Sequence, residues 1–125
     1  MPARLLVVGA GGFLGAALRY AVNVLAQRWL PASFPCATFL VNVTGCFAIG
    51  LLVATFDQGR AGLTPRLFWV AGVLGGYTTF SAFGYETLAL LRAGSPGAAW
   101  ANVVGQVTLG LLAVWAGAWL ARAWA

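Results

Sequence analysis

The stretch that organises this chain is Gly72-Val73-Leu74-Gly75-Gly76-Tyr77-Thr78-Thr79-Phe80-Ser81-Ala82-Phe83. It lies inside an apolar segment, 67–91, that is long enough to cross a bilayer as one helix. Yet Gly costs a helix about 1 kcal/mol relative to Ala, and Thr is a poor helix former. An opened helix persists in hydrocarbon only where protein buries it or where it lines a wet cavity. The stretch therefore predicts either a helix break at mid-membrane or the close packing of a small-residue helix face.

The composition is that of an integral membrane protein. Hydrophobic residues make up 62% of the 125 residues and charged residues only 7%, whereas soluble domains carry about 25% charged residues. Four apolar stretches reach the ~20 residues that span a bilayer, namely 5–30, 35–56, 67–91 and 97–120. We expect an all-α fold in one integral membrane domain, 1–125, in the inner or plasma membrane, with no cleaved signal peptide.

The charged side chains exclude several function classes. They are seven arginines, Asp57 and Glu86, with no lysine or histidine. The arginines are scattered and do not form the basic stripe of a nucleic-acid-binding protein. No Cys/His set has metal-ligand spacing and no nucleophile–base pair is present, so we do not expect an enzyme.

Topology signals are weak and favour an antiparallel homodimer. With four spans, one side of the membrane would carry four arginines, namely Arg4, Arg60, Arg66 and Arg122. The other side would carry two, Arg28 and Arg92. So thin a margin permits both orientations under the positive-inside rule. Four helices of this size cannot enclose a pore and pack a core at once. An antiparallel dimer resolves both difficulties, and it would place two copies of the break at 75–81 opposite each other.

Three features of the first two spans are informative. Gly11 and Gly15 have small-xxx-small spacing, which predicts a helix-packing face; a dinucleotide-binding loop would need a βαβ unit. Arg19 lies deep in its span, where a guanidinium costs ~2.5–3.5 kcal/mol on insertion scales. It should face a polar interior or a partner, although it could snorkel to the interface. Asn42 is the one amide of the second span, and it is either an interhelical cross-link or a ligand donor.

The third and fourth spans carry further polar side chains. Glu86 is the only carboxylate within a span, which makes it a functional-site candidate by default. It shares one helical stripe with Phe80 and Phe83, whose rings could otherwise simply pack in a core. The polar residues of the fourth span are Asn102, Gln106 and Thr108.

Three motifs of this chain occur together in a known family. They are Gly11-Gly12-x-x-Gly15-x-x-x-Arg19-Tyr20, Asn42-x-x-Gly45 and Gly75-Gly76-x-Thr78-Thr79-Phe80-Ser81-x-Phe83-x-x-Glu86. Asn102 in the fourth span fits the same pattern. With these motifs the chain resembles the Fluc (CrcB) fluoride channel family over essentially its whole length.

The resemblance implies a dual-topology homodimer with two antiparallel pathways, which exports fluoride passively and so reduces cytoplasmic fluoride toxicity. It also implies a structural Na⁺ at the dimer interface, held by the backbone carbonyls of Gly75 and Thr78 of each subunit. The chemistry agrees, because a helix opened around 75–78 frees carbonyls, and four of them on a twofold axis would repel one another without a cation. No carboxylate is near in sequence to balance a divalent ion, and Na⁺ fits a four-oxygen cage better than K⁺.

Fluoride is small and strongly hydrated, so a pathway must offer it hydrogen-bond donors at every step. Phenyl edges are electropositive and can meet an anion edge-on, and weak binding at several sites is what conduction needs. With the family's positions and these donors, the predicted pathway is Asn42, Thr79, Phe80, Ser81, Phe83, Glu86, Asn102, Gln106 and Thr108, with Arg19 as a polar anchor.

Two other functions are compatible with four apolar spans. A small multidrug-resistance-type transporter exchanges protons for cationic drugs through a carboxylate in its first span, where this chain has Arg19 and no acid. A non-transporting membrane assembly subunit would explain the glycine faces but not the row of phenyl and polar side chains on facing helices.

Overall fold

The computed structural model describes residues 1–124, apart from the side chain of Arg60. Its elements are α1 (Pro2–Trp29), α2 (Cys36–Thr55), η1 (Phe56–Arg60), α3 (Leu63–Arg66), η2 (Leu67–Leu74), α4 (Gly75–Tyr77), α5 (Phe80–Arg92) and α6 (Pro96–Ala123). Four helical segments are long and apolar enough to cross a membrane, namely Pro2–Trp29, Cys36–Gly59, Leu63–Arg92 and Pro96–Ala123. The predicted all-α fold with four spans is confirmed. The predicted domain, 1–125, ends on Ala125, which lies outside the described residues.

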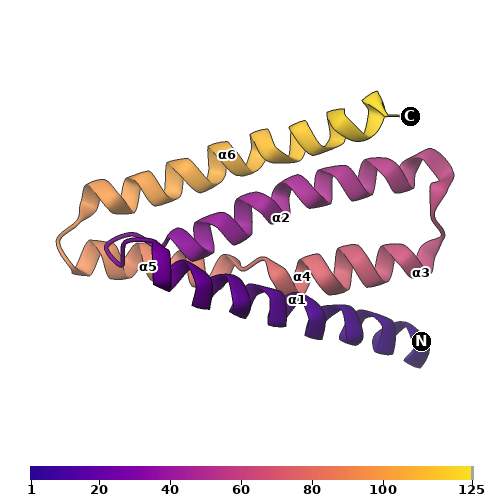
Figure 1. Cartoon of the computed structure of the whole chain (residues 1–125), viewed down its shortest axis with the longest axis horizontal. Helices are drawn as coiled ribbons and strands as arrows, with labels where there is room; N and C mark the ends of the chain where they lie inside the picture. Colours follow the sequence, from indigo (N-terminus) through magenta and orange to yellow (C-terminus); the bar gives the residue numbers. More distant parts are fainter. Residues whose placement is uncertain (125) are drawn as a thin grey trace.

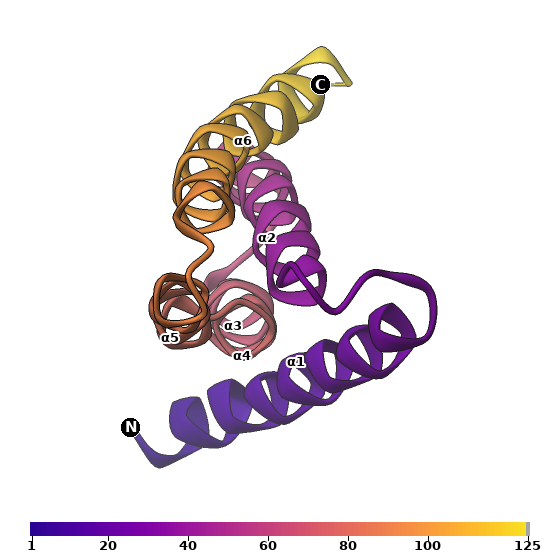
Figure 2. The same cartoon turned by 90° about the vertical axis from the view of Figure 1, so that its left-hand side faces the viewer.

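The four spans run back and forth, so that both chain ends lie at one end of the bundle together with the α2–α3 turn (Figure 1). The α1–α2 and α5–α6 connections lie at the other end. The most extensive contacts join α2 to α6 and α1 to η2. Figure 2 shows α1 crossing beneath the other helices at a steep angle. Between α2 and α6 the backbones meet at glycines, since a Cβ on Gly50 would collide with the carbonyl oxygen of Val114, and one on Gly117 with that of Phe47.

Glycines also bring α1 against the third span. A Cβ built on Gly11 would collide with the carbonyl oxygen of Phe68, and one on Gly15 with that of Val73. Both glycines are buried. The predicted packing face is therefore confirmed, and it explains why small residues recur along α1, because only glycine lets the two backbones approach so closely.

The third span is broken within the predicted stretch 75–81, at its two threonines and not at its glycines. The sequence predicted an opening around 75–78, but α4 (Gly75–Tyr77) is a turn of α-helix that continues the π-helical η2. The backbone is extended at Thr78 (φ −81°, ψ 158°) and at Thr79 (φ −152°, ψ 119°). The helix restarts at Phe80, where the Thr79 hydroxyl accepts from the Ala82 N–H as an N-cap. Gly75 and Gly76 are thus helical, and the backbone leaves the helix at Thr78 and Thr79.

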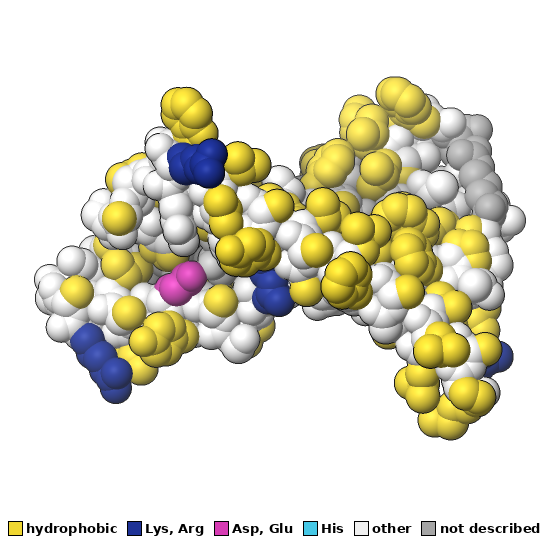
Figure 3. Space-filling view, turned by 60° about the horizontal axis from the view of Figure 1, so that its bottom comes forward, with side chains coloured by type: hydrophobic (Ala, Val, Ile, Leu, Met, Phe, Trp, Pro, Cys, Tyr) yellow, Lys and Arg dark blue, Asp and Glu magenta, His cyan; other side chains and the backbone are white. Residues whose placement is uncertain are grey.

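The outer surface is largely apolar. Figure 3 shows hydrophobic side chains spread over most of one face, with few charged groups among them. Large hydrophobic residues that are exposed occur on the helices of all four spans, including Phe13, Phe47, Trp69 and Trp115. Such a surface suits lipid or a partner subunit and would be unusual for a soluble monomer.

Candidate functional site

The centre of the site is the pairing of Asn42 with the broken third span. The Thr79 N–H donates to Asn42 Oδ1 at 2.9 Å, and Asn42 Nδ2 donates to the Thr79 carbonyl at 3.0 Å. Thus one amide side chain satisfies both backbone groups of the residue at which the helix opens. One turn further along α2, Gly45 leaves room for the Thr78 methyl, which a Cβ at position 45 would meet. The Asn42-x-x-Gly45 motif therefore has a structural reason, because both residues accommodate the break.

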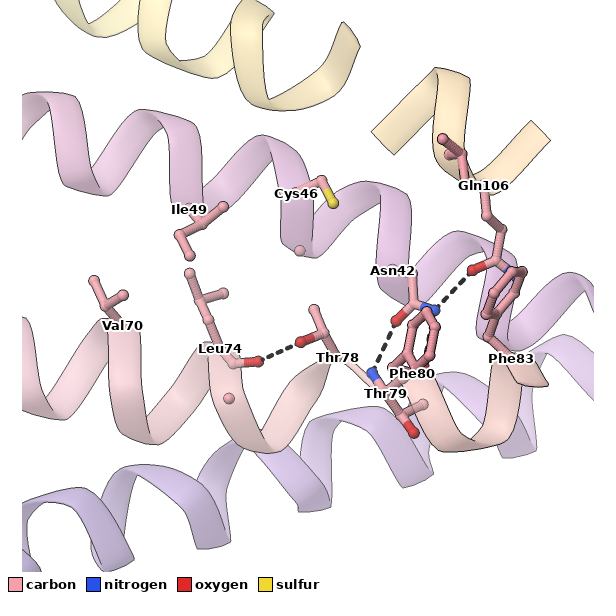
Figure 4. A pocket seen from close by; sticks show the side chains of 13 residues that line it. Asn42, Cys46, Ile49, Val70, Leu74, Thr78, Thr79, Phe80, Phe83 and Gln106 are labelled. Atoms are coloured by element: carbon pink, nitrogen blue, oxygen red, sulfur yellow. Dashed lines mark hydrogen bonds between the residues drawn. The ribbon is translucent and has the colours of Figure 1, made fainter. Parts of the chain in front are cut away.

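A groove of about 380 Å³ opens beside this pairing (Figure 4). It brings together five of the predicted pathway residues, namely Asn42, Thr79, Phe80, Phe83 and Gln106. Gly75 and Thr78, the predicted carbonyl ligands, also line it. The rest of the lining is mostly aliphatic, with the Cys46 thiol among it. The groove is thus an apolar surface interrupted by polar residues from α2, the third span and α6.

The break frees the backbone carbonyls of two residues that line this groove, Gly75 and Thr78. In an uninterrupted helix the Thr79 N–H would donate to the Gly75 carbonyl, but here it donates to Asn42. Likewise the Ala82 N–H, which would donate to the Thr78 carbonyl, donates to the Thr79 hydroxyl. The carbonyls of Gly75 and Thr78 therefore both lose their regular helical partners.

The two phenyl rings lie at the mouth of the groove, where α5 begins. Their centroids are 5.4 Å apart and the planes are tilted by 48°. Phe80 is 82% exposed, so its ring is not part of the core of the chain. Ser81 follows at the exposed start of α5, and its hydroxyl lies 3.2 Å from that of Thr79. Ring edges and two hydroxyls are thus available on one turn of helix.

A chain of amides extends from Asn42 through the fourth span. Asn42 Nδ2 donates to Gln106 Oε1 at 2.7 Å, and Gln106 Nε2 donates to Asn102 Oδ1 at 2.9 Å. Asn102 Nδ2 donates to the Thr87 hydroxyl at 3.0 Å, which in turn donates to the Phe83 carbonyl at 2.8 Å. Asn102 is fully buried and is absent from the groove lining. Of the predicted fourth-span residues, only Gln106 reaches the groove.

Glu86 lies apart from the groove. Thr38 donates to Glu86 Oε1 at 2.7 Å, whereas Oε2 is buried and has no hydrogen-bond partner among the described residues. Glu86 lines a second cavity of about 550 Å³, between α1, the α1–α2 connection and α2, together with Asn23, Gln27 and Cys36. Of the predicted pathway residues, Glu86 is thus separated from the five that line the groove.

Four predicted residues line neither hollow, namely Ser81, Asn102, Thr108 and Arg19. Thr108 is exposed and stands two positions after Gln106 on α6, which is about 200° around a helix. Thr108 therefore points away from Asn102 and Gln106, and its predicted role in the pathway stays a prediction. Arg19 is half-buried on α1, and within the described part of the chain it forms no ion pair or hydrogen bond. Its predicted polar partner is not found in this subunit.

Sequence reasoning missed Thr87 and gave Thr38 no role in the site. Thr87 follows Phe83 by one turn, so the i, i+4 spacing on α5 was the available signal. Thr38 precedes Asn42 by one turn on α2, and it binds Glu86 across 48 residues of sequence. Both are threonines on the polar side of otherwise apolar helices, which is a weak signal without the partner helix.

Comparison with known proteins identifies the family. Residues 6–118 match the family model described as CrcB-like protein, Camphor Resistance (CrcB). A relative from Rhizobium meliloti (strain 1021) is 51% identical over 122 residues, which is 95% of this chain and 96% of the relative. One from Solibacter usitatus is 46% identical over 94% of this chain and 97% of its own length, and one from Thermus thermophilus is 46% identical over 91% of each. All three are named fluoride-specific ion channel FluC. With this match over most of its length, the chain belongs to the CrcB family.

Proposed function

We propose that this chain is the subunit of a fluoride-selective ion channel that lets fluoride leave the cytoplasm passively and so lowers its toxicity. The observation that carries the proposal is the groove, in which two phenyl rings, two amides and the Thr79 hydroxyl gather beside a broken helix. The Ser81 hydroxyl lies 3.2 Å from that of Thr79. The names of the relatives support the same ion. The protein acts as a channel and performs no covalent chemistry.

The groove can replace the hydrogen bonds that fluoride loses when it leaves water. The hydroxyls of Thr79 and Ser81 can turn their protons toward an anion, and the positive edges of Phe80 and Phe83 can approach it without a fixed charge. None of these contacts is strong, so an ion can pass from one to the next, as conduction requires.

Asn42 acts in two ways in this proposal. Both of its N–H groups are engaged in the subunit, one by the Thr79 carbonyl and one by Gln106 Oε1. It is therefore an interhelical cross-link first. A fluoride ion in the groove would compete with Gln106 for one N–H, so the same amide also serves as the donor that the sequence predicted.

The functional unit is an antiparallel homodimer. The groove is open, and Phe80 is 82% exposed at its edge, so a single subunit leaves one wall of the pathway missing. A second copy in the inverted orientation would supply that wall and would receive one in return. The phenyl rings and the freed carbonyls of the two copies would then share one dry interface.

A structural Na⁺ at that interface is supported by the state of the backbone. The carbonyls of Gly75 and Thr78 are both released from the helix, because their usual amide partners donate to side-chain oxygens. Both residues line the open groove. Hard monovalent cations take such oxygen ligands, and two carbonyls from each of two subunits make a set of four. Bound there, the ion would supply a buried positive charge that favours nearby anions.

The cation proposal predicts that assembly depends on Na⁺. Because the ion binds only the assembled dimer, it should stabilise that state by mass action, by about 2.7 kcal/mol at 100 times its dissociation constant. When Na⁺ is replaced exhaustively by N-methylglucamine, we expect the dimer to be weaker, so that a smaller dilution of the protein in detergent separates its two copies. We also expect fluoride flux to fall. Subunit exchange, followed by fluorescence transfer between labelled copies, measures this. Identical exchange in the two cations would contradict the site.

The multidrug-transporter alternative finds less support. Such a transporter needs a carboxylate where it can meet a cationic drug in the first span, but Glu86 lies on α5, is bound by Thr38, and faces a different cavity from the groove. An assembly subunit without transport would have no need for the exposed pairing of phenyl rings and hydroxyls at the start of α5.

Liposomes test the function directly. Purified protein is reconstituted into vesicles loaded with potassium fluoride or potassium chloride, and efflux is started with valinomycin and followed by ion-selective electrodes. We expect rapid fluoride release and chloride retention at the level of protein-free vesicles. Equal release of the two anions, or proton-driven uptake of a cationic dye, would overturn the proposal.

A further inference from the structure

The amide chain of the site begins and ends on backbone groups, which fixes its direction. At one end the Thr79 N–H can only donate and its carbonyl can only accept, so Asn42 must present its oxygen to the first and its nitrogen to the second. At the other end the Phe83 carbonyl can only accept, so the Thr87 hydroxyl must donate to it. No choice of amide orientation is left free between these ends.

Between its two ends, each hydrogen bond of the amide chain joins a donor to an acceptor. The second N–H of Asn42 needs an acceptor and finds Gln106 Oε1. Gln106 then has its nitrogen free for Asn102, and Asn102 has its nitrogen free for the Thr87 hydroxyl. Turning any one amide would place donor against donor at one neighbour and acceptor against acceptor at the other. All hydrogen bonds of the amide chain can therefore form in only one set of amide orientations.

The two ends of the chain lie one turn apart on the same helix. Thr79 is the N-cap of α5 and Phe83 is in its first turn, while the members between them come from α2 and α6. The hydrogen bonds and the backbone from Thr79 to Phe83 thus form a closed ring through three spans. This turn is the one that carries Phe80, Ser81 and Phe83, which are the groups proposed to meet the ion.

We propose that Thr87 and Asn102 are positioning residues that hold the Asn42 amide, and with it the ion-facing turn of α5, in one orientation. Asn102 is fully buried, and neither residue lines the groove or the Glu86 cavity. Their effect must therefore pass through Gln106 to Asn42 instead of through contact with the ion. The proposal reassigns Asn102 from the predicted pathway to its support, and it rests on the proposed function only for its consequence on flux.

Thr87 allows a clean test because valine has its shape. Thr87→Val removes the hydroxyl that accepts from Asn102 and donates to Phe83, whereas Thr87→Ser keeps it. Thr55→Val is the matched control, since the Thr55 hydroxyl also donates to the carbonyl four residues before it, at 2.8 Å, but joins no other helix. If Thr87→Val does not yield folded protein, Thr87→Cys replaces the hydroxyl by a weaker donor and acceptor of similar size.

The first readout is the Asn42 side chain itself. The chain has only three asparagines, Asn23, Asn42 and Asn102, so protein labelled with ¹⁵N-asparagine gives three side-chain amide pairs in a nuclear magnetic resonance spectrum. We expect Thr87→Val to move the Asn42 pair, Thr87→Ser to restore it, and Thr55→Val to leave it in place. Asn23, which lines the other cavity, serves as the internal reference. An unmoved Asn42 pair in folded Thr87→Val would overturn the proposal.

The second readout is fluoride flux per folded dimer. Loss of one neutral hydrogen bond is worth about 1 kcal/mol, or about fivefold, and we expect Thr87→Val to lose flux by that factor while Thr87→Ser and Thr55→Val conduct normally. A moved Asn42 resonance with unchanged flux would overturn the role in conduction. If wild-type protein released no fluoride at all, the proposed function would fail, and the resonances would still decide whether the ring exists.

Discussion

Asn42→Asp should abolish fluoride flux, by more than about 100-fold. The substitution removes both N–H groups, so the Thr79 carbonyl and Gln106 Oε1 would each face a carboxylate oxygen at the 2.7–3.0 Å that now separates them from the Asn42 nitrogen. Leaving a buried polar group without its partner costs about 1–3 kcal/mol. In addition, a negative charge in the groove would repel an incoming anion.

The Asn42→Asp result needs a control for charge alone. Gln58→Glu makes the same amide-to-acid change in the α2–α3 turn, where Gln58 only bonds weakly to the Ala121 carbonyl at 3.3 Å. We expect this variant to conduct like the wild type. Vesicle efflux is compared at equal amounts of folded protein, measured by size-exclusion chromatography. Wild-type flux from folded Asn42→Asp protein would reduce Asn42 to a packing residue.

Phe80→Ile and Phe83→Ile should each lower fluoride flux by about tenfold or more. Isoleucine fills much of the space of the ring but has no electropositive edge for an anion, and a pair of aromatic rings is worth about 0.5–1.5 kcal/mol beyond its burial. Because the two centroids are only 5.4 Å apart, loss of one ring should also disturb the other. Methionine is polarizable and adaptable, so the Phe→Met variants should lose less.

Phe13→Ile is the matched control for the rings. Phe13 is 79% exposed on α1 and lines neither hollow of the subunit, so its substitution should leave flux unchanged. All variants are compared by fluoride efflux from vesicles at equal dimer content. Normal conduction by both Phe→Ile variants at positions 80 and 83 would show that these rings only fill space.

The four spans and the glycine packing faces were predictable, because they depend on local pattern alone. A run of about 20 apolar residues can only be a span, and Gly11 and Gly15 repeat at the helical period. The gathering of Asn42 with Phe80 and Phe83 was also predictable once the family resemblance was seen. For these residues, the local sequence pattern or a family motif is enough to predict the structure.

The place of the break was not predictable from propensity. Gly75 stays helical, whereas Thr78 and Thr79 open, because the Thr79 peptide finds partners on Asn42, 37 residues away in sequence. Thr87 was missed for the same reason, since its partner Asn102 is on another helix. Thr108 and Gln106 lie two residues apart and so point to opposite faces of α6, and the role predicted for Thr108 stays a prediction.

The extended residues at Thr78 and Thr79 also bear on how the chain enters the membrane during synthesis. α5 has 13 residues, about 20 Å of helix, which is too short to cross ~30 Å of hydrocarbon alone. Both halves of the third span must therefore leave the insertion machinery together, with an open peptide group that costs several kcal/mol in lipid. Because α2 is synthesised before the third span, the Asn42 amide is available to the Thr79 peptide group as soon as that span is made, whereas Gln106 on α6 is made last. The order of the helices in the gene thus delivers the cross-link before the segment that depends on it.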